Sequence, residues 1–341
     1  QMKKILILSL VFCFLVSVVP VIALAEEYDY LDMSSTATGL TVGDTSKSVI
    51  VRGAKVVTGT LQLSAPLTSG VTYRSDNFDV LSVDQSGKLT PKKEGVAKVT
   101  VFYGSLKQSV MIMVHKGIFK QEDFESYAEN SEPFGKGYIA QSPNNKYSGT
   151  YWIRTNVKRS GSKSLCLRDL RDGADAGLYT GGSWMVVDAF NNQDAPRSQR
   201  GVLEFWIYDI GLSRNGTTIR LWGNFPEGQF QAERSLRGWI SFFDNNKYSY
   251  KDDGKNSQHQ REDLYHWSTT PKDRTNPYGW HQVIVDYTDD NAYRIYMDGD
   301  KIGEITGSES GPINGGLESV QLIRYFSTTV PCQAYYDDFV I

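Results

Sequence analysis

The sequence predicts an all-β protein in which a small β-sandwich is followed by a larger antiparallel one. Short apolar runs alternate with turn residues along most of the chain, and many of its 31 glycines stand at those turns. No long stretch shows a convincing apolar period of 3.6 residues, which disfavours helices. The length of 341 residues is enough for two domains of ordinary size.

The chain begins with the pattern of an export signal. Lys3 and Lys4 precede an apolar run over 5–21, and small residues at 23 and 25 fit the cleavage rule, so we expect a signal peptide over 1–25. A membrane anchor is the alternative, but the short run, its internal proline and the cleavage pattern disfavour it. We therefore expect a secreted, extracellular protein, either free or held at the cell surface, whose mature chain does not insert into a membrane.

Charge and cysteine content restrict the classes of partner. Removal of the signal takes two of the 36 basic residues and none of the 39 acidic ones, which leaves a net charge of −5. A mildly acidic chain without a basic cluster is unsuited to nucleic acid or to an anionic membrane surface. Cys166 and Cys332 remain, and they form either one disulfide or two buried thiols.

Residues 26–36 are a polar linker, and 37–117 have the pattern of the first sandwich. Its expected strands are 49–51, 60–63, 80–83, 97–102 and 110–114. The segments 73–77, 80–84, 86–90 and 94–101 resemble the bacterial immunoglobulin-like domains of group 2, known as BIG2. The resemblance implies an Ig-like domain that acts as a spacer or adhesion unit, and we favour a plain spacer.

Residues 118–341 form the second sandwich. Its expected strands are 164–167, 201–208, 217–222, 238–243, 280–287, 293–297, 301–305, 319–324 and 334–341, with hairpin turns at 289–291 and 298–300. The segments 279–285 and 293–303, together with 123–126 and 336–341, resemble the concanavalin A-like lectins and glucanases, in particular their laminin-G-like members. The resemblance implies a jelly roll, a fold that hosts lectins, binding modules, hydrolases and lyases.

Alternation along three of these strands predicts a non-core face rich in aromatic and polar residues. Sugar rings stack on aromatic side chains, and their hydroxyls need paired donors and acceptors. Arginines on such a face can also hold the carboxylate of a uronic acid. The alternative is that the tryptophans are covered by loops or belong to a second core layer. The expected carbohydrate-binding residues on this face are Glu204, Trp206, Arg220, Trp222, Arg294 and Tyr296.

Three more tryptophans stand among polar loop residues, where they form either the rim of a binding site or plugs over the ends of the sandwich. They are Trp152, Trp184 and Trp267. In related jelly rolls a calcium ion ties the first strand to the last, and Glu125, Asp337 and Asp338 match those positions by resemblance. Carboxylates are the ligands that calcium prefers. Paired or solvated acids are the alternative interpretation.

The catalytic motifs of two enzyme classes with this fold are absent from the sequence. The Glu-x-Asp-x-x-Glu strand of the glucanases and the Arg-Ser-Glu and Gln-Ile-His motifs of the alginate lyases are missing. We therefore predict a non-catalytic protein that binds polysaccharide or a cell-surface glycan. One alternative is a polysaccharide lyase on the same face, with Arg220, Tyr296, Gln282 and one of three histidines as its residues (His259, His266 and His281). The other is a protein-binding adhesin or surface-layer component.

Overall fold

Every regular element that the computed structural model describes is a β-strand, which confirms the predicted all-β class. The same part of the chain contains no helix long and apolar enough to cross a bilayer. The described residues are 28–58, 60–117, 121–131, 139–141, 151–168, 183–187, 201–209, 217–222, 236–243, 247–252, 272–273, 279–289, 292–306, 319–324 and 333–340. The expected signal peptide lies outside them.

The first nine strands form an N-terminal unit with two main sheets. One sheet has the order β1-β3-β4 and the other β2-β9-β8-β5, while β6 and β7 pair with each other. Only the β2–β9 pair is parallel among the pairings described for this unit. The strands are β1 (Tyr30–Asp32), β2 (Leu40–Thr41), β3 (Arg52–Val57), β4 (Thr60–Pro66), β5 (Val71–Ser75), β6 (Leu81–Val83), β7 (Leu89–Pro91), β8 (Gly95–Tyr103) and β9 (Leu106–His115).

The expected strand over 49–51 is wrong. Val49 and Val51 are buried in the core of the unit, but they belong to an irregular segment before β3. The Val49 amide donates to the carbonyl of Gly87, and the carbonyl of Val51 accepts from Leu67. The backbone groups of this segment therefore form their hydrogen bonds with loops. An apolar run of three residues does not by itself indicate a paired strand.

The remaining strands form an antiparallel two-sheet sandwich of the predicted jelly-roll class, here called the C-terminal unit. An eight-stranded sheet has the order β12-β13-β24-β15-β20-β21-β22, with β10 added on β24. A seven-stranded sheet has the order β11-β14-β23-β16-β17-β18-β19. The strands are β10 (Gln121–Glu122), β11 (Ile139–Gln141), β12 (Tyr151–Arg154), β13 (Ser164–Arg168), β14 (Ser183–Val187), β15 (Val202–Asp209), β16 (Thr217–Trp222), β17 (Leu236–Phe243), β18 (Lys247–Asp252), β19 (Lys272–Asp273), β20 (Trp280–Asp289), β21 (Ala292–Met297), β22 (Asp300–Thr306), β23 (Ser319–Arg324) and β24 (Gln333–Val340).

The core of the C-terminal unit lies between its two sheets, and alternation explains its membership. Phe205 and Val283 from the eight-stranded sheet share one buried cluster with Ile219, Leu221 and Leu322 from the seven-stranded sheet. The tight turn at Asp298-Gly299 confirms the predicted hairpin, because both residues have positive φ, at 47° and 86°. These facts fix which face of each sheet points inward and which points away.

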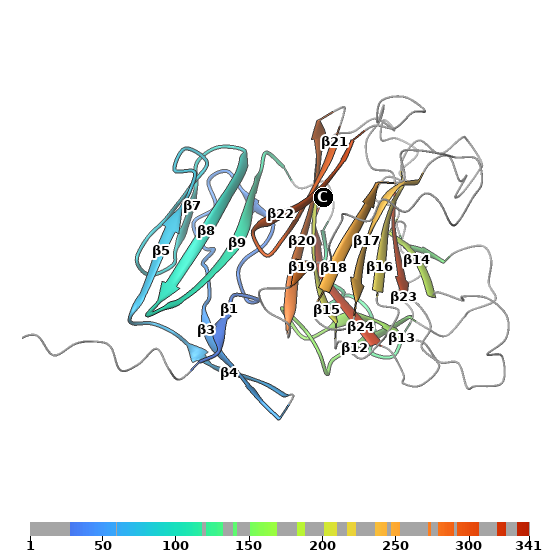
Figure 1. Ribbon diagram of the computed structural model, residues 1–341, viewed down its shortest axis with the longest axis horizontal. Coiled ribbons are helices and arrows are strands. Elements are labelled where there is room, and N and C mark those ends of the chain that lie inside the picture. Colours follow the sequence, from blue (N-terminus) through green and yellow to red (C-terminus); the bar gives the residue numbers. More distant parts are fainter. Residues whose placement is uncertain are drawn as a thin grey trace, which may run out of the picture.

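The N-terminal unit packs against the outer face of the eight-stranded sheet (Figure 1). One hydrophobic cluster runs through the core of the N-terminal unit and on to four residues of that sheet, Cys166, Trp206, Trp280 and Tyr335. Strands β14, β16 and β23 of the seven-stranded sheet lie on the side away from the N-terminal unit (Figure 1). The two outer faces of the jelly roll therefore have different surroundings.

Candidate functional site

The outer face of the eight-stranded sheet carries Glu204 and Trp206, which the sequence predicts as carbohydrate-binding residues. In the structure Glu204 is 2% exposed and Trp206 is 3% exposed. Both therefore lie beneath the N-terminal unit, and the expectation that this face is open to a ligand is wrong for them. Strand alternation correctly took them out of the sandwich core, but it carried no signal of a second unit that covers the face.

Gln282 holds the two units together next to Glu204. Its side-chain oxygen accepts from the backbone N–H of Met111 at 3.0 Å, and its amide nitrogen donates to the carbonyl of Met111 at 2.7 Å. The same nitrogen donates to Oε1 of Glu204 at 2.7 Å. Met111 belongs to β9, so the Gln282 side chain forms two hydrogen bonds across the junction in the manner of a paired backbone. Met111 is part of a buried cluster with Met113, Val202 and Ile284.

Arg159 forms the second polar contact at the junction, beside Trp206. Its Nη1 bonds to the carboxylate of Asp338, and its Nη2 donates to the carbonyl of Thr36 in the N-terminal unit. Its backbone N–H donates to Asp337 at 3.0 Å, and its guanidinium lies 4.1 Å from the ring centre of Trp206. Trp206 therefore stacks on an internal cation, where a sugar had been expected.

Burial at the junction raises the pKa of two carboxyl groups, those of Glu204 and Asp337. Burial, together with the negative charge of Asp338, raises the pKa of Glu204 to about 7, against the hydrogen bond from Gln282 and the charge of Arg159. Burial and the adjacent Asp338 also raise the pKa of Asp337 well above its usual range. In a cleft such values would mark catalytic acids, but here they belong to residues sealed between two packed units.

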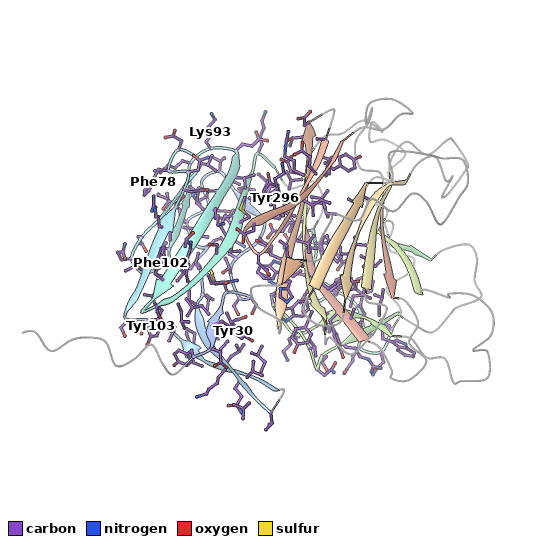
Figure 2. The ribbon with its side chains drawn as sticks, in the orientation of Figure 1. Tyr30, Phe78, Lys93, Phe102, Tyr103 and Tyr296 are labelled. Atoms are coloured by element: carbon purple, nitrogen blue, oxygen red, sulfur yellow. The ribbon has the colours of Figure 1, made fainter. Side chains whose placement is uncertain are left out.

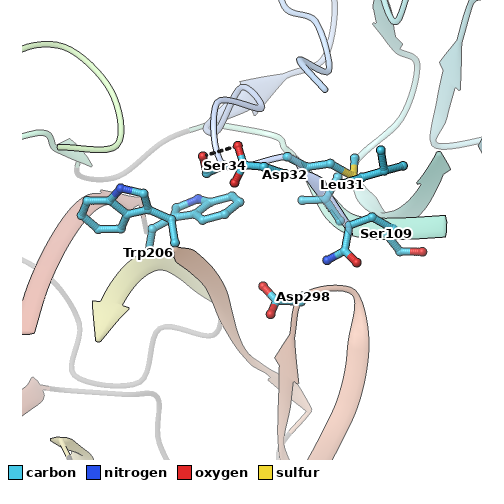
Figure 3. A pocket seen from close by; sticks show the side chains of 10 residues that line it. Leu31, Asp32, Ser34, Ser109, Trp206 and Asp298 are labelled. Carbon is cyan, nitrogen blue, oxygen red and sulfur yellow. Dashed lines mark hydrogen bonds between the residues drawn. The ribbon is translucent and has the colours of Figure 1, made fainter. Parts of the chain in front are cut away.

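A narrow cleft opens at the edge of this junction (Figure 3). It is lined by Asp32 and Ser34 from the N-terminal unit and by Trp206 and Asp298 from the C-terminal unit. The Ser34 hydroxyl donates to Asp32 at 2.8 Å, and burial raises the pKa of Asp32. Because Asp32 and Trp206 are buried, the cleft offers no open ring face on which a sugar can stack.

The hairpin of β21 and β22 carries two more predicted binding residues. Arg294 is held by acids of the neighbouring strand: its Nη2 lies 2.6 Å from Asp289 and its Nη1 3.7 Å from Asp286. Tyr296 lies where the hairpin meets the N-terminal unit, packed against the cluster that contains Met111 (Figure 2). Both positions confirm the predicted alternation, while their binding role stays a prediction.

The predicted calcium ligands lie near the paired first and last strands of the C-terminal unit, where Glu122 faces Phe339 in the register. The Glu125 carboxylate accepts from the backbone of Ser162 and of Lys163, both at 2.8 Å. In the described part of the chain no group of three or more histidines, cysteines or acids could hold a metal ion. Calcium at Glu125, Asp337 and Asp338 therefore stays a prediction.

Three of the remaining predicted residues belong to the seven-stranded sheet, at backbone positions that alternate with those of core residues. Ile219, Leu221 and Leu322 point into the core, so the alternate positions of these strands lie on the opposite face. Arg220 and Trp222 occupy alternate positions of β16, and Trp184 is in register with Ile323 and so with Thr218 on the same face. The backbone register thus brings together residues that the sequence pattern had assigned to separate strands and loops.

The same register adds residues that the sequence analysis did not single out. Arg220 is opposite Trp239 on one side and Gln321 on the other, and Trp239 is opposite Lys251. A row across four adjacent strands therefore reads Lys251, Trp239, Arg220 and Gln321. The sequence marked the strand of Trp239 but gave no pairing between strands, and that pairing is what assembles the row.

Two predicted rim tryptophans and one cysteine complete the comparison with the sequence. Trp152 is partly buried on β12, with the guanidinium of Arg154 at 5.5 Å from its ring centre. Trp267 lies outside the described residues. Cys166 is buried, whereas Cys332 lies outside the described residues, so the choice between one disulfide and two buried thiols stays open.

Comparisons with known proteins show similarity to solved structures only. No family model matches the chain, and no curated protein matches it. An endo-β-1,4-glucuronan lyase from the fungus Trichoderma reesei is 13% identical over 63% of this chain and 94% of its own, with a TM-score of 0.39. The endo-β-1,3(4)-glucanase SCLam of family GH16 is 12% identical over 65% and 89%, with a TM-score of 0.41.

An endo-acting O-glycanase from human gut microbiota is similar to the same degree, at 14% identity over 66% of this chain and 98% of its own, with a TM-score of 0.42. Similarities of this size do not indicate an activity or a substrate. The geometry of the chain itself therefore carries the functional argument.

Proposed function

We propose that the protein is an exported carbohydrate-binding protein that holds a polysaccharide on the outer face of the seven-stranded sheet. The observation that carries the proposal is the register row Lys251, Trp239, Arg220 and Gln321. Adjacent strands of a sheet lie about 4.8 Å apart, so this row collects one aromatic, two cations and one amide within a few strand widths. Export follows from the predicted signal peptide over 1–25.

The chemistry of the row fits a sugar polymer that carries carboxylates. An indole offers a flat apolar face for a pyranose ring, and an amide supplies both a donor and an acceptor for hydroxyls. Arg220 and Lys251 flank Trp239 in the register, and the row contains no acid to neutralise them. A guanidinium binds a carboxylate through two parallel hydrogen bonds. Uronic-acid polysaccharides are therefore the class of ligand we expect.

The other sheet supports the proposal by contrast. Glu204 and Trp206 are covered by the N-terminal unit, which leaves the seven-stranded sheet as the better candidate for a long polymer. The N-terminal unit then serves as a support packed on the far face of the jelly roll. Calcium at Glu125, Asp337 and Asp338 is retained as a proposal, to be tested in the same experiment with and without chelator.

Affinity electrophoresis tests the proposal directly. The protein is run through gels that contain pectin, alginate or polyglucuronate, and through gels with xylan or β-glucan, beside the variants Trp239→Ala, Arg220→Ala and Trp222→Ala. We expect retardation in the acidic gels that is weakened at least tenfold in the Trp239→Ala and Arg220→Ala variants. Phe78→Ala is the matched control, because Phe78 is an exposed aromatic of the N-terminal unit at 59%.

The outcomes separate the candidate functions. Retardation that persists in all three variants would contradict this face as the site. New unsaturated ends in the same gels would make the protein a polysaccharide lyase. The absence of retardation in every gel would move the assignment to a protein-binding surface component.

A further inference from the structure

The seven-stranded sheet collects positive charge on one side, although the expected mature chain has a net charge of −5. Strands β14, β23, β16, β17 and β18 are adjacent in this sheet (Figure 1). Residues directly opposite each other in the register share a side, so the register identifies the positions of each strand that lie away from the core. In these five strands those positions include three cations, Arg220, Lys247 and Lys251, and no acid.

The register separates Lys247 from the other two cations. Lys247 is opposite Asp273 of β19, so an acid stands next to it on the same side. Lys251 and Arg220 are instead opposite Trp239, one on each side of it. Within the described strands no acid is in register with either of these two cations. Their charge is therefore the part of this side that suits an anionic ligand.

Lys251, Trp239 and Arg220 stand on three successive strands, β18, β17 and β16. No bulge interrupts this row, because the register shift between β16 and β17 falls further along, between Leu221 and Trp222. Adjacent strands lie about 4.8 Å apart, so the backbone positions of the two cations are about 10 Å apart with Trp239 midway. A sugar chain that crosses the strands with one ring at Trp239 therefore brings its flanking residues toward the two cations.

We propose that Lys251 and Arg220 bind two carboxylates of one polysaccharide chain at the same time, on either side of a sugar ring held at Trp239. The inference rests on the proposed function and narrows its ligand to polyuronates, whose main chain carries carboxylates in succession. A guanidinium holds a carboxylate through two hydrogen bonds and an ammonium attracts it as a point charge. A neutral chain with sparse uronic-acid branches offers one carboxylate at a time and cannot occupy both cations. Lys251 is thus a specificity-determining residue.

Two polymers of different carboxylate spacing test the inference. Dissociation constants are measured by affinity electrophoresis in polyglucuronate and in glucuronoxylan, for the protein, for Lys251→Ala, for Arg220→Ala and for the double variant. In polyglucuronate we expect each single variant to bind about tenfold more weakly and the double variant about a hundredfold, because each removes one charge-assisted contact. In glucuronoxylan each single variant keeps most of its affinity, since the remaining cation still binds the one carboxylate, and only the double variant loses it.

Lys247→Ala is the matched control, because Lys247 is a cation of the same strand and side but is opposite Asp273. Its affinity for both polymers is expected to equal that of the unchanged protein, and thermal melts verify that all variants are folded. Equal losses in Lys247→Ala and Lys251→Ala would overturn the inference, because only net charge would then matter. Equal losses of each single variant in both polymers would overturn it as well.

The same gels separate this inference from the proposed function. Binding to polyglucuronate that Lys251→Ala keeps and Trp239→Ala loses overturns the two-carboxylate inference alone and leaves the proposed function standing. The absence of binding to either polymer by the unchanged protein overturns both.

Discussion

The two sheets of the jelly roll have similar residue types at the positions that alternate with core residues, yet the N-terminal unit covers the outer face of only one of them, the eight-stranded sheet. Trp206 in the eight-stranded sheet and Trp222 in the seven-stranded sheet both occupy positions that alternate with core residues. Trp206 is buried against Arg159 and the N-terminal unit, whereas Trp222 belongs to the sheet on the far side. Alternation therefore identifies which residues of a strand point away from the core. Whether another part of the chain covers those residues depends on long-range packing.

Buried polar side chains hold the covered face at two places. Gln282 completes backbone-like hydrogen bonds with Met111, and Arg159 joins Asp338 to the carbonyl of Thr36. Such contacts fix one geometry, because a shifted partner would leave buried donors and acceptors unpaired. The N-terminal unit is thus seated on the jelly roll through directional contacts, which goes beyond the plain spacer expected from the sequence.

The largest effect expected at the junction is that of Arg159→Leu. The substitution leaves Asp337 and Asp338 buried without their cation, and loss of one partner of a buried ion pair costs about 3–5 kcal/mol. Guanidinium unfolding monitored by tryptophan fluorescence measures the loss. A cost below about 1 kcal/mol would show that the carboxylates reach water or another cation, and that the buried network is not what holds the covered face.

The second prediction concerns the pH dependence of stability. Glu204 has a pKa of about 7 in the folded protein against about 4.5 when unfolded, so the folded state binds its proton more tightly. Stability therefore falls as pH rises from about 4.5 to about 7 and levels off above that, by roughly 3 kcal/mol in total. In Glu204→Gln the part of the pH dependence of stability that comes from Glu204 disappears.

Unfolding free energies at pH 4.5, 6 and 8 test this for the protein and for Glu204→Gln. The raised pKa of Asp337 gives a slope of the same sign in both, so the difference between the two curves isolates Glu204. Parallel curves would mean that Glu204 is ionised in the folded state and solvated at the junction.

A smaller effect is expected for Gln282→Met, which keeps the side-chain volume but removes the amide. The N–H and carbonyl of Met111 and the carboxyl of Glu204 then lose a partner, and unsatisfied buried groups cost about 1–3 kcal/mol. Differential scanning calorimetry measures the cost and also shows whether the single transition splits in two. An unchanged melting profile would indicate that water replaces the amide and that the Gln282 contact contributes little to the coupling of the two units.

The sequence predicted the fold class and most strands of the jelly roll because alternation is a local property. The edges of 217–222 and 319–324 agree with β16 and β23 to the residue. The candidate site was predicted only in part, since Arg220, Trp222 and Trp184 were named but Trp239, Lys251 and Gln321 became visible only through the pairing of distant strands. The burial of Trp206 depends on residues more than ninety positions earlier, and no local pattern contains it.

The smallest effect is expected for Lys98→Ala, which removes the exposed ion pair between the units. Lys98 Nζ lies 2.6 Å from Asp300, but the two side chains are 29% and 61% exposed. Exposed pairs contribute about 0–1 kcal/mol, because water and salt screen the attraction and two long side chains lose freedom. A double-mutant cycle with Asp300→Ala at low and high salt measures the coupling. A coupling of several kcal/mol that persists at high salt would mean that water does not reach the Lys98–Asp300 pair. The edge of the junction would then be as well shielded from solvent as the buried contacts of Gln282 and Arg159.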